Sequence, residues 1–355
     1  MIIRQLIFAI VTAIAAFLIY VYPVNILTYL LFDTKLVEPA AIGASFVLAG
    51  LLFFYLRTHS TSAILRHLTH YGMGMGFIAL MVGHLGLLAC VFLPELRHDI
   101  GLVCVVLTGA LIVIALWQGR HVIVKRLDIR SDKIDEVHKL VFISDVHLGS
   151  NSSGHLRALC QKIEALDYEA LLIGGDLFDS SAFKTQDLAP IGMISKPIFY
   201  VTGNHEYYVK DHLEKLSHIK EHNITWLDNE AALFQAIQII GVSDAQCAAS
   251  QRQIAQGFIK ADLFNLLLVH QPAIWDDVPE NTDFMISGHT HNGQIMPFNW
   301  LVRLQFKAVY GLYQKAATKL YVSSGAGTWG PAMRLGTHNE IIHITIAPSG
   351  PETKT

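Results

Sequence analysis

The sequence predicts an α/β domain preceded by an all-α bundle of transmembrane helices, and three observations lead to this prediction. Four long apolar stretches lie in the N-terminal third of the chain. Residues 1–119 contain only five of the 26 Lys and Arg residues and four of the 29 Asp and Glu residues. Beyond residue 139, short apolar runs alternate with polar, helix-like segments. We therefore expect a four-helix transmembrane domain at residues 1–119, a linker at 120–138 and the α/β domain at 139–355.

The N-terminal apolar stretches are each close to the ~20 residues that a helix needs to cross a bilayer. They lie at about Gln5–Tyr22, Val37–Leu56, Gly72–Leu93 and Ile100–Trp117. The first lacks a clear small-residue cleavage site and three more follow it, which favours a retained span over a signal peptide. A soluble core made of buried helices is the alternative interpretation of these stretches.

The positions of positively charged residues predict the orientation of the helices. Arg4 precedes the first stretch, Arg57 and Arg66 lie between the second and third, and five Lys or Arg residues at 120–133 follow the fourth. Loops of this kind favour the cytoplasmic side, and with four spans all three regions share one side. We expect a multi-pass protein of the cell (inner) membrane with its α/β domain facing the cytoplasm.

The overall charge and the cysteines argue against two classes of protein. The formal net charge is −3, without the basic stripe that nucleic-acid-binding proteins carry. We therefore expect no nucleic-acid partner, and a nuclease is the weakest alternative. The four cysteines form no CxxC pair, so neither a zinc ribbon nor a disulfide framework is indicated.

Residues 139–355 contain a succession of predicted strands and helices. Short, continuous apolar runs predict buried strands, and amphipathic segments predict helices. The predicted strands are 140–143, 170–173, 198–201, 264–269, 283–286, 320–322 and 341–346, and the predicted helices are 156–166 and 208–219. This alternation is typical of an α/β sandwich.

Most of the predicted strands are followed by residues that can bind metal. The five clusters are Asp145 with His147, Asp176 with Asp179, Asn204 with His205, His270 alone, and His289 with His291. Loops at the carboxyl ends of strands converge on one crevice. Carboxylate and imidazole ligands suit Mn, Fe or Zn better than Ca. The clusters therefore predict one metal site, rather than a set of unrelated helix caps and surface histidines.

The motifs DxH, GDxxD, GNHE, a single His and GHxH follow one another in this order. This order resembles the calcineurin-like metallophosphoesterase superfamily over residues 139–346. Two later segments, Gly288–Gln294 and Ser324–Thr328, resemble its bacterial membrane-associated branch. The resemblance implies a four-layer αββα sandwich, in which helices flank two β-sheets. It also implies hydrolysis of phosphoric ester or diphosphate bonds.

The resemblance further implies two groups of metal ligands that share one carboxylate. The first group is Asp145, His147 and His291, the second is Asn204, His270 and His289, and the bridging residue is Asp176. His205 would contact the phosphate and protonate the leaving group, and Asp179 would orient His205. The cofactors implied are two divalent metal ions, Mn²⁺ first, with Fe²⁺ or Zn²⁺ as alternatives. Arg334 is either a phosphate or diphosphate contact or a surface or structural ion-pair residue.

These features together favour a membrane-bound, metal-dependent phosphohydrolase. Its substrate would be a phosphorylated small molecule or lipid, and one resembling group cleaves UDP-diacylglucosamine. Ser180 and Ser181 follow Asp179 where protein phosphatases of the superfamily have Arg-Gly, which argues against a phosphoprotein substrate. The alternative is a membrane sensor or transport component whose metal-binding domain does not catalyse.

The segment 295–313 combines several aromatic residues with two cations. Phe298, Trp300 and Phe306 lie close to Arg303 and Lys307, and the segment has no acidic residue. This composition suits a membrane interface. Aromatic residues that pack the edge of the sandwich are an equally good interpretation.

Overall fold

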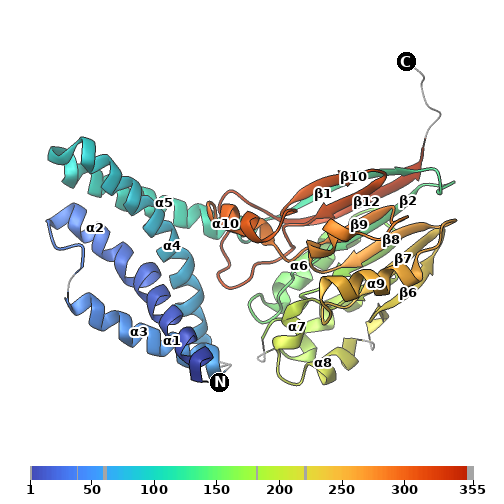
Figure 1. Cartoon of the computed structure of the whole chain (residues 1–355), viewed down its shortest axis with the longest axis horizontal. Coiled ribbons are helices and arrows are strands. Elements are labelled where there is room, and N and C mark those ends of the chain that lie inside the picture. The colour runs from blue at the N-terminus through green and yellow to red at the C-terminus, as the bar shows by residue number, and fades with distance from the viewer. Residues whose placement is uncertain (1, 38, 59–61, 181–182, 220–221, 350–355) are drawn as a thin grey trace, which may run out of the picture. The chain divides into compact units, whose positions relative to one another are not determined.

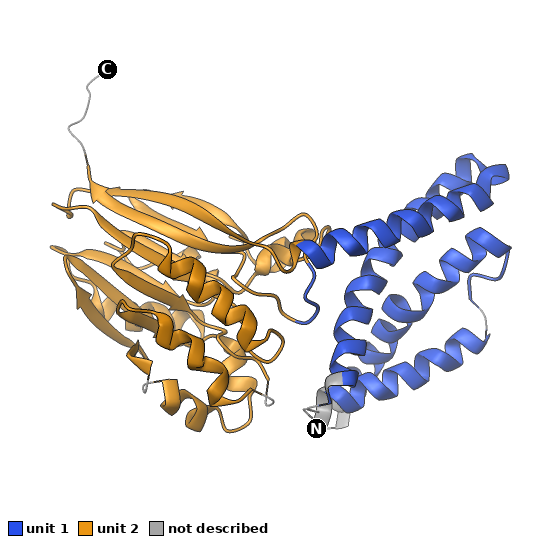
Figure 2. Ribbon diagram, turned by 180° about the vertical axis from the view of Figure 1, so that it is seen from behind, with its two compact units in different colours: residues 1–117, 330–333 blue, residues 118–329, 334–355 orange. Residues whose placement is uncertain are grey.

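The computed structural model describes residues 2–37, 39–58, 62–180, 183–219 and 222–349. The chain divides into two compact units, which are coloured separately in Figure 2. The first, called the helical unit below, is Met1–Trp117 with Gly330–Met333. The second, called the α/β unit, is Gln118–Trp329 with Arg334–Thr355.

All four apolar stretches of the helical unit form helices. The first stretch is one helical run made of α1 (Ile2–Ala16), a π-helical turn (Phe17–Val21) and α2 (Tyr22–Phe32). The others are α3 (Pro39–Thr58), α4 (Ala63–Phe92) and α5 (Arg97–Gln118), with a 3₁₀ turn at Pro94–Leu96. Three described segments are long and apolar enough to cross a membrane: Leu6–Phe32, Ile64–Phe92 and Pro94–Gln118. The apolar part of α3, Pro39–Tyr55, is shorter.

The first helical run continues past its predicted end at Tyr22, although Pro23 follows directly. Proline has no N–H to donate and its ring crowds the preceding turn of an α-helix. The π-helical turn ends at Val21, two residues before this proline. Its wider hydrogen-bond spacing accommodates the hydrogen bond that the proline cannot make. The run therefore continues to Phe32.

Glycines on α4 allow close packing between helices. A Cβ atom at Gly76 would lie 1.8 Å from the carbonyl oxygen of Ile19, so only glycine lets these two backbones meet. Gly83 approaches the side chain of Ile26 in the same way.

Two six-stranded sheets build the α/β unit (Figure 1). The first has the order β1-β12-β2-β3-β4-β5 and the second has the order β10-β11-β9-β8-β7-β6. The first contains β1 (Val122–Ser131), β2 (His138–Ile143), β3 (Ala170–Gly174), β4 (Ile198–Val201), β5 (Ile224–Trp226) and β12 (Asn339–Pro348). The second contains β6 (Glu230–Phe234), β7 (Ile237–Val242), β8 (Phe264–Val269), β9 (Phe284–Ser287), β10 (Gly311–Lys315) and β11 (Thr318–Val322).

Helices cover the outer faces of the two sheets. α6 (Ser153–Glu164) and α8 (His212–Ile219) pack on the first sheet, and α9 (Ala248–Phe258) packs on the second. Two further helices, α7 (Asn204–Tyr208) and α10 (Phe298–Gln305), lie in the segments that follow β4 and β9. Short 3₁₀ segments lie at Thr185–Met193, Pro272–Asp277 and His291–Gly293.

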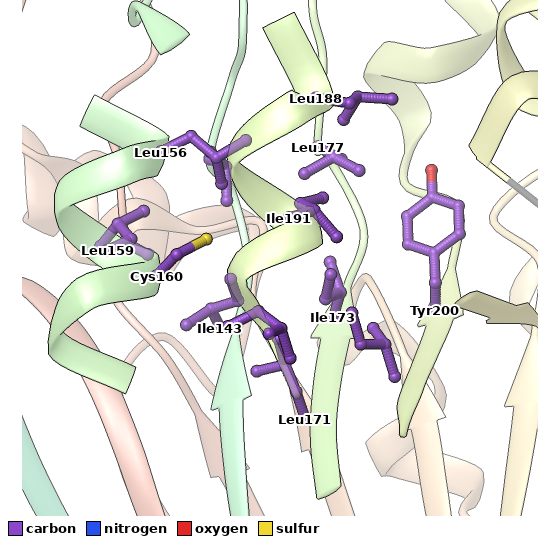
Figure 3. Packing of buried hydrophobic residues seen from close by; sticks show 14 of the residues in the cluster. Ile143, Leu156, Leu159, Cys160, Leu171, Ile173, Leu177, Leu188, Ile191 and Tyr200 are labelled. Carbon is purple, nitrogen blue, oxygen red and sulfur yellow. The ribbon is translucent and has the colours of Figure 1, made fainter. Parts of the chain in front are cut away.

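Alternation of side chains along the strands produces the layers. On β2, Leu140 and Phe142 join the apolar core between the sheets, whereas Val141 and Ile143 point the other way, toward α6. Figure 3 shows this outer core, where side chains from α6, β2, β3 and the 3₁₀ segment Thr185–Met193 meet. A third core forms between the second sheet and α9. The α/β unit is thus the four-layer sandwich that was predicted.

Residues 120–138, predicted to be a linker, contain the edge strand β1. This strand pairs in parallel with β12 along its whole length. Leu127 and Ile129 are buried in the core between the sheets, while the charged residues beside them face outward. The linker prediction is therefore wrong for residues 122–131. An edge strand with one exposed face has a charge content similar to that of a linker, so composition alone did not separate the two.

Candidate metal centre

The loops that carry the predicted ligands follow neighbouring parallel strands. β2, β3 and β4 are parallel neighbours in the first sheet, and β7, β8 and β9 are parallel neighbours in the second. The carboxyl ends of parallel strands lie at the same edge of a sheet, so the loops that follow them are brought together. Residues that are far apart in the sequence thereby meet in one place.

Five of the seven predicted ligands adopt a left-handed backbone conformation. These residues are Asp145 (φ 56°), His147 (φ 52°), Asp176 (φ 54°), His289 (φ 71°) and His291 (φ 50°). A non-glycine residue in this region costs of order 1 kcal/mol, and such residues cluster at functional sites. The sharp turns direct each side chain back across the end of its strand.

Asp145, His147 and His291 form the first cluster. Nε2 of His147 and Nε2 of His291 lie 3.1 Å apart. Oδ1 of Asp145 is 3.4 Å from Nε2 of His291 and 3.9 Å from Nε2 of His147. All three side chains are buried or nearly so, and their ligand atoms converge on one point. This agrees with the first ligand group that the resemblance implies.

Asp176, His270 and His289 form the second cluster. Oδ2 of Asp176 lies 3.1 Å from Nε2 of His270, and that nitrogen lies 3.2 Å from Nδ1 of His289. Nδ1 of His270 is 2.9 Å from the carbonyl oxygen of Gly174, which fixes the ring orientation.

Asp176 lies between the two clusters. Its Oδ2 atom is 3.1 Å from His270 in the second cluster and 3.8 Å from His147 in the first. Its Oδ1 atom accepts a hydrogen bond from the backbone N–H of His205 at 2.9 Å. One carboxylate therefore faces the ligand atoms of both groups.

Asn204 has a buried side-chain oxygen, Oδ1, without a hydrogen-bond partner among the described residues. A buried acceptor that lacks a donor is costly unless something else satisfies it. An amide oxygen beside carboxylates and imidazoles is a suitable ligand for a divalent cation. The donor set is therefore compatible with two metal ions.

Asp179 lies closest to His147. Its Oδ2 atom is 3.2 Å from Nδ1 of His147, and its Oδ1 atom accepts a hydrogen bond from the backbone N–H of Ser150. Asp179, His147 and His205 also form a group whose ligand atoms all lie within 4.8 Å of one another. The predicted partner of Asp179 was His205, but its direct contact is with a ligand of the first cluster.

His205 is surrounded by three other rings. The ring centroid of His147 lies 4.8 Å away, that of Tyr208 5.4 Å and that of Trp329 5.7 Å. Burial lowers the pKa of His205 to about 4, so the imidazole is neutral at pH 7.

Burial and neighbouring charges shift the pKa values of His289 and His270 in opposite directions. Burial, reinforced by His270, lowers the pKa of His289 to about 3. Burial opposes protonation of His270 too, but the carboxylate of Asp176 outweighs it and raises the pKa of His270 well above its usual value. In the protein without metal, His270 therefore carries a proton beside Asp176.

Glu206 is a buried residue of the site to which the sequence prediction gave no role. Its carboxylate accepts hydrogen bonds from four backbone N–H groups, those of Gly203 (2.7 Å), Asp176 (3.1 Å), Leu177 (2.5 Å) and Phe178 (3.3 Å). Burial raises the pKa of Glu206 to about 7. The side chain ties the loop after β3 to the loop after β4. Its position in the GNHE motif was the only sequence signal.

Arg334 has no exposed surface. It donates hydrogen bonds to the carbonyl oxygens of His291 (3.0 Å), Gly327 (2.9 Å) and Ser324, and to the side chain of Asn339. The prediction that it contacts a phosphate is therefore wrong, because its donors are used inside the protein. The alternative, a surface or structural ion-pair arginine, is wrong as well, because the residue is buried and its partners are carbonyl and amide oxygens rather than a carboxylate.

The α/β unit thus combines two stacked sheets with carboxylates and imidazoles that converge at the ends of their strands. Residues 138–293 match the family described as calcineurin-like phosphoesterase. The matched residues lie within the α/β unit and include every residue of the two clusters.

The chain is also similar in sequence to three proteins whose names include metallophosphoesterase. An uncharacterized metallophosphoesterase of Helicobacter pylori is 35% identical over 239 residues, covering 63% of this chain and 64% of the relative. One of Campylobacter jejuni is 36% identical over 244 residues, covering 63% of each chain. A "transmembrane protein with metallophosphoesterase domain" of Bos taurus is 30% identical over 234 residues, covering 59% of this chain and 52% of the relative. The chain thus spans less than two thirds of the length of each of these relatives.

Proposed function

We propose that this chain is a membrane-bound phosphohydrolase that cleaves a phosphoester, phosphodiester or diphosphate bond with two divalent metal ions. The position of Asp176 between the two clusters carries this proposal, because a shared carboxylate holds two cations at a fixed separation. The first ion would be held by Asp145, His147 and His291, and the second by Asn204, His270 and His289. When bound, the two ions would supply an activated water and positive charge at the phosphoryl group.

Two further residues of the site, His205 and Asp179, would help to orient the substrate and to protonate the leaving group. His205 is neutral at pH 7 and lies beside both clusters, so one of its ring nitrogens can donate a hydrogen bond to a phosphate oxygen. Protonation of the leaving oxygen requires the imidazolium form, so His205 would first take up the proton that the attacking water loses and would then pass it to the leaving oxygen. Asp179 would act on this residue indirectly, through His147, whose Nδ1 atom it contacts. The mixture of oxygen and nitrogen ligands favours Mn²⁺, with Fe²⁺ or Zn²⁺ as alternatives.

The apolar helices support a substrate that is itself bound to the membrane. A lipid-linked phosphoester or a nucleotide-sugar diphosphate of the UDP-diacylglucosamine type has an apolar tail and a phosphate group that a membrane-bound enzyme meets together. We propose that the protein lies in the inner membrane with its α/β unit in the cytoplasm. The charged residues near the ends of the helices support this orientation.

The first experiment is a hydrolysis assay of the full-length protein with bis-p-nitrophenyl phosphate and Mn²⁺. Loss of a residue that only supports a metal ligand costs about 10–100-fold in activity. Asp176→Asn alters the shared ligand itself, so we expect kcat/KM to fall by at least about 100-fold. The exposed Asp262→Asn is the matched control and should retain wild-type activity. A screen of lipid extracts and nucleotide sugars with the same pair of variants then identifies the substrate.

The assay also tests the non-catalytic alternative. Wild-type protein that binds two equivalents of metal but cleaves neither the model diester nor any screened substrate would contradict the proposal. It would favour a membrane sensor or transport component with a metal-binding domain.

A further inference from the structure

Helix α10 exposes apolar side chains and buries a polar one. The exposed fractions are 46% for Phe298, 64% for Trp300, 56% for Leu301 and 84% for Leu304. Asn299, in contrast, is only 8% exposed. A helix on the surface of a water-soluble domain normally shows the opposite pattern, with its apolar residues against the core. The outward face of α10 is therefore suited to an apolar environment.

The exposed face of α10 is backed by tight packing against the turn that carries a predicted ligand. Gly293, two residues after His291, approaches the backbone of Asn299 so closely that a Cβ there would lie 2.3 Å away. At the other end of the helix, the ring of Phe306 lies 5.3 Å from that of His289. The inner face of α10 is thus held to the α/β unit, and its outward face cannot turn inward.

The charged residues in the stretch of sequence that contains α10 are all positive. No acidic residue occurs between Asp283 and Glu340 in the sequence, whereas this stretch contains five Lys or Arg residues. Arg303 lies on α10 itself and is exposed. Lys307 follows the helix and pairs with Asp276 at 2.9 Å, so it is partly neutralised. Positive charge beside an apolar helical face is complementary to a layer of anionic lipid headgroups.

The α/β unit begins close in sequence to a candidate membrane span. Only residues 119–121 separate the span Pro94–Gln118 from the first strand, Val122–Ser131. A segment extends at most about 3.5 Å per residue, so the first strand would start close to the surface of the bilayer that this candidate span would cross. An apolar face on this unit therefore has lipid within reach.

We propose that α10 is an interfacial membrane helix, with Trp300, Leu301 and Leu304 among the acyl chains and Arg303 at anionic headgroups. The occupant of this face is the bilayer that the N-terminal helices cross. This proposal is independent of the proposed catalytic activity. It assigns a second, non-spanning membrane contact to the chain.

The test places a nitroxide label at Leu304→Cys in full-length protein whose four native cysteines have been replaced. The protein is reconstituted in nanodiscs that contain phosphatidylcholine and phosphatidylglycerol. The matched control is Leu213→Cys on α8, where the native leucine is 68% exposed. Collision rates with oxygen, which enters lipid, and with a water-soluble nickel chelate give a depth parameter for each label. We expect a positive value at position 304 and a negative value at position 213.

Two results would overturn the proposal. A label at 304 that nickel reaches as readily as the label at 213 means that the face is in water. A label at 304 that neither reagent reaches means that protein covers it, either a second copy of the chain or another segment. Thermal unfolding of both labelled variants checks that the fold is retained.

The assignment of Arg303 has its own test. In nanodiscs of phosphatidylcholine alone, the depth parameter at 304 is expected to fall while staying positive. Arg303→Gln should cause a similar fall in the mixed nanodiscs, because it removes the same attraction. A depth that is insensitive to both changes would overturn the contact between Arg303 and anionic headgroups.

Discussion

Glu206 accepts hydrogen bonds from four backbone N–H groups in the loops that carry Asp176 and Asn204. In Glu206→Gln, a donor NH₂ group replaces one oxygen and faces those N–H groups. We expect the loops to separate and the Kd for Mn²⁺ to rise about 10–100-fold, the usual cost of losing support around metal ligands. Calorimetric titration measures this, with the exposed Glu230→Gln as control. An unchanged Kd would show that the loops hold their spacing without this carboxylate.

The proton on His270 predicts how metal binding depends on pH. The pKa of His270 is raised well above its usual value by Asp176, so the metal-free protein holds this proton at pH 7. A ligand nitrogen must lose its proton to bind metal, so affinity for Mn²⁺ should increase as pH rises and binding should release a proton. Titrations at two pH values, each in two buffers of different ionisation enthalpy, measure both effects. Affinity that decreases with rising pH would contradict the prediction.

Substitution of Arg334 is expected to lower the stability of the protein without removing a contact to the substrate. Lysine has fewer donors and no planar fork, so Arg334→Lys leaves buried carbonyl groups of the loops without partners. We expect the free energy of unfolding to fall by about 2 kcal/mol or more. Urea unfolding followed by tryptophan fluorescence measures the change, and the exposed Arg252→Lys should be neutral. Equal stability of the two variants would mean that solvent replaces the lost donors.

At the scale of elements, substitutions in β1 test whether residues 122–131 form an edge strand that contributes to the core or a linker that does not. Ile129 is 2% exposed and packs between the sheets, whereas Val124 on the same strand is 40% exposed. Ile129→Ala is expected to lower the free energy of unfolding by about 2–4 kcal/mol, and Val124→Ala by much less. Unfolding curves of the two variants provide the comparison. Equal, small effects would mean that residues 122–131 do not contribute to the core.

Burial explains which strands the sequence revealed. β2, β3, β4 and β8 are buried along nearly their whole length, so they appear as continuous apolar runs. β7 is equally buried, but Gln238 interrupts its apolar run, and the side-chain NH₂ group donates a hydrogen bond to the carbonyl oxygen of Phe258. β5 has three residues and β10 is half-exposed, so neither has a periodic pattern long enough to detect. The predicted helix at 208–219 begins too early, because Tyr208 is the last residue of α7 and α8 begins at His212.

At the scale of the whole molecule, the four-layer architecture and the convergence of the site residues were predictable from strand-end motifs. The carboxylates and imidazoles of each cluster meet, because parallel strands bring their following loops to one edge. That Asn204 joins the second cluster stays a prediction. The roles of Glu206 and Arg334 were not predictable. Each depends on backbone groups from loops distant in the sequence, and a residue type does not reveal which carbonyl or N–H it will face.

The orientation of the chain in the membrane is a prediction for the whole molecule. Four spans place both ends of the chain on the cytoplasmic side, whereas crossing by only the three longest segments would place them on opposite sides. Fusions at either end to a fluorescent protein should be bright, and fusions to a periplasm-dependent phosphatase should be inactive. A C-terminal phosphatase fusion that is active would contradict the predicted orientation. The same fusions made in the loop after α4 serve as the opposite control.

The parallel pairing of β1 with β12 has a practical consequence for isolating the α/β unit. The first and last strands of the unit are neighbours, so the segment that directly follows the helical unit in the sequence forms the edge of the sheet. A chain shortened to start at residue 139 would leave β12 as an exposed edge strand, which could pair with the same strand of another molecule. A chain that starts at residue 119 keeps the strand, and should stay dispersed in solution where the shorter one precipitates.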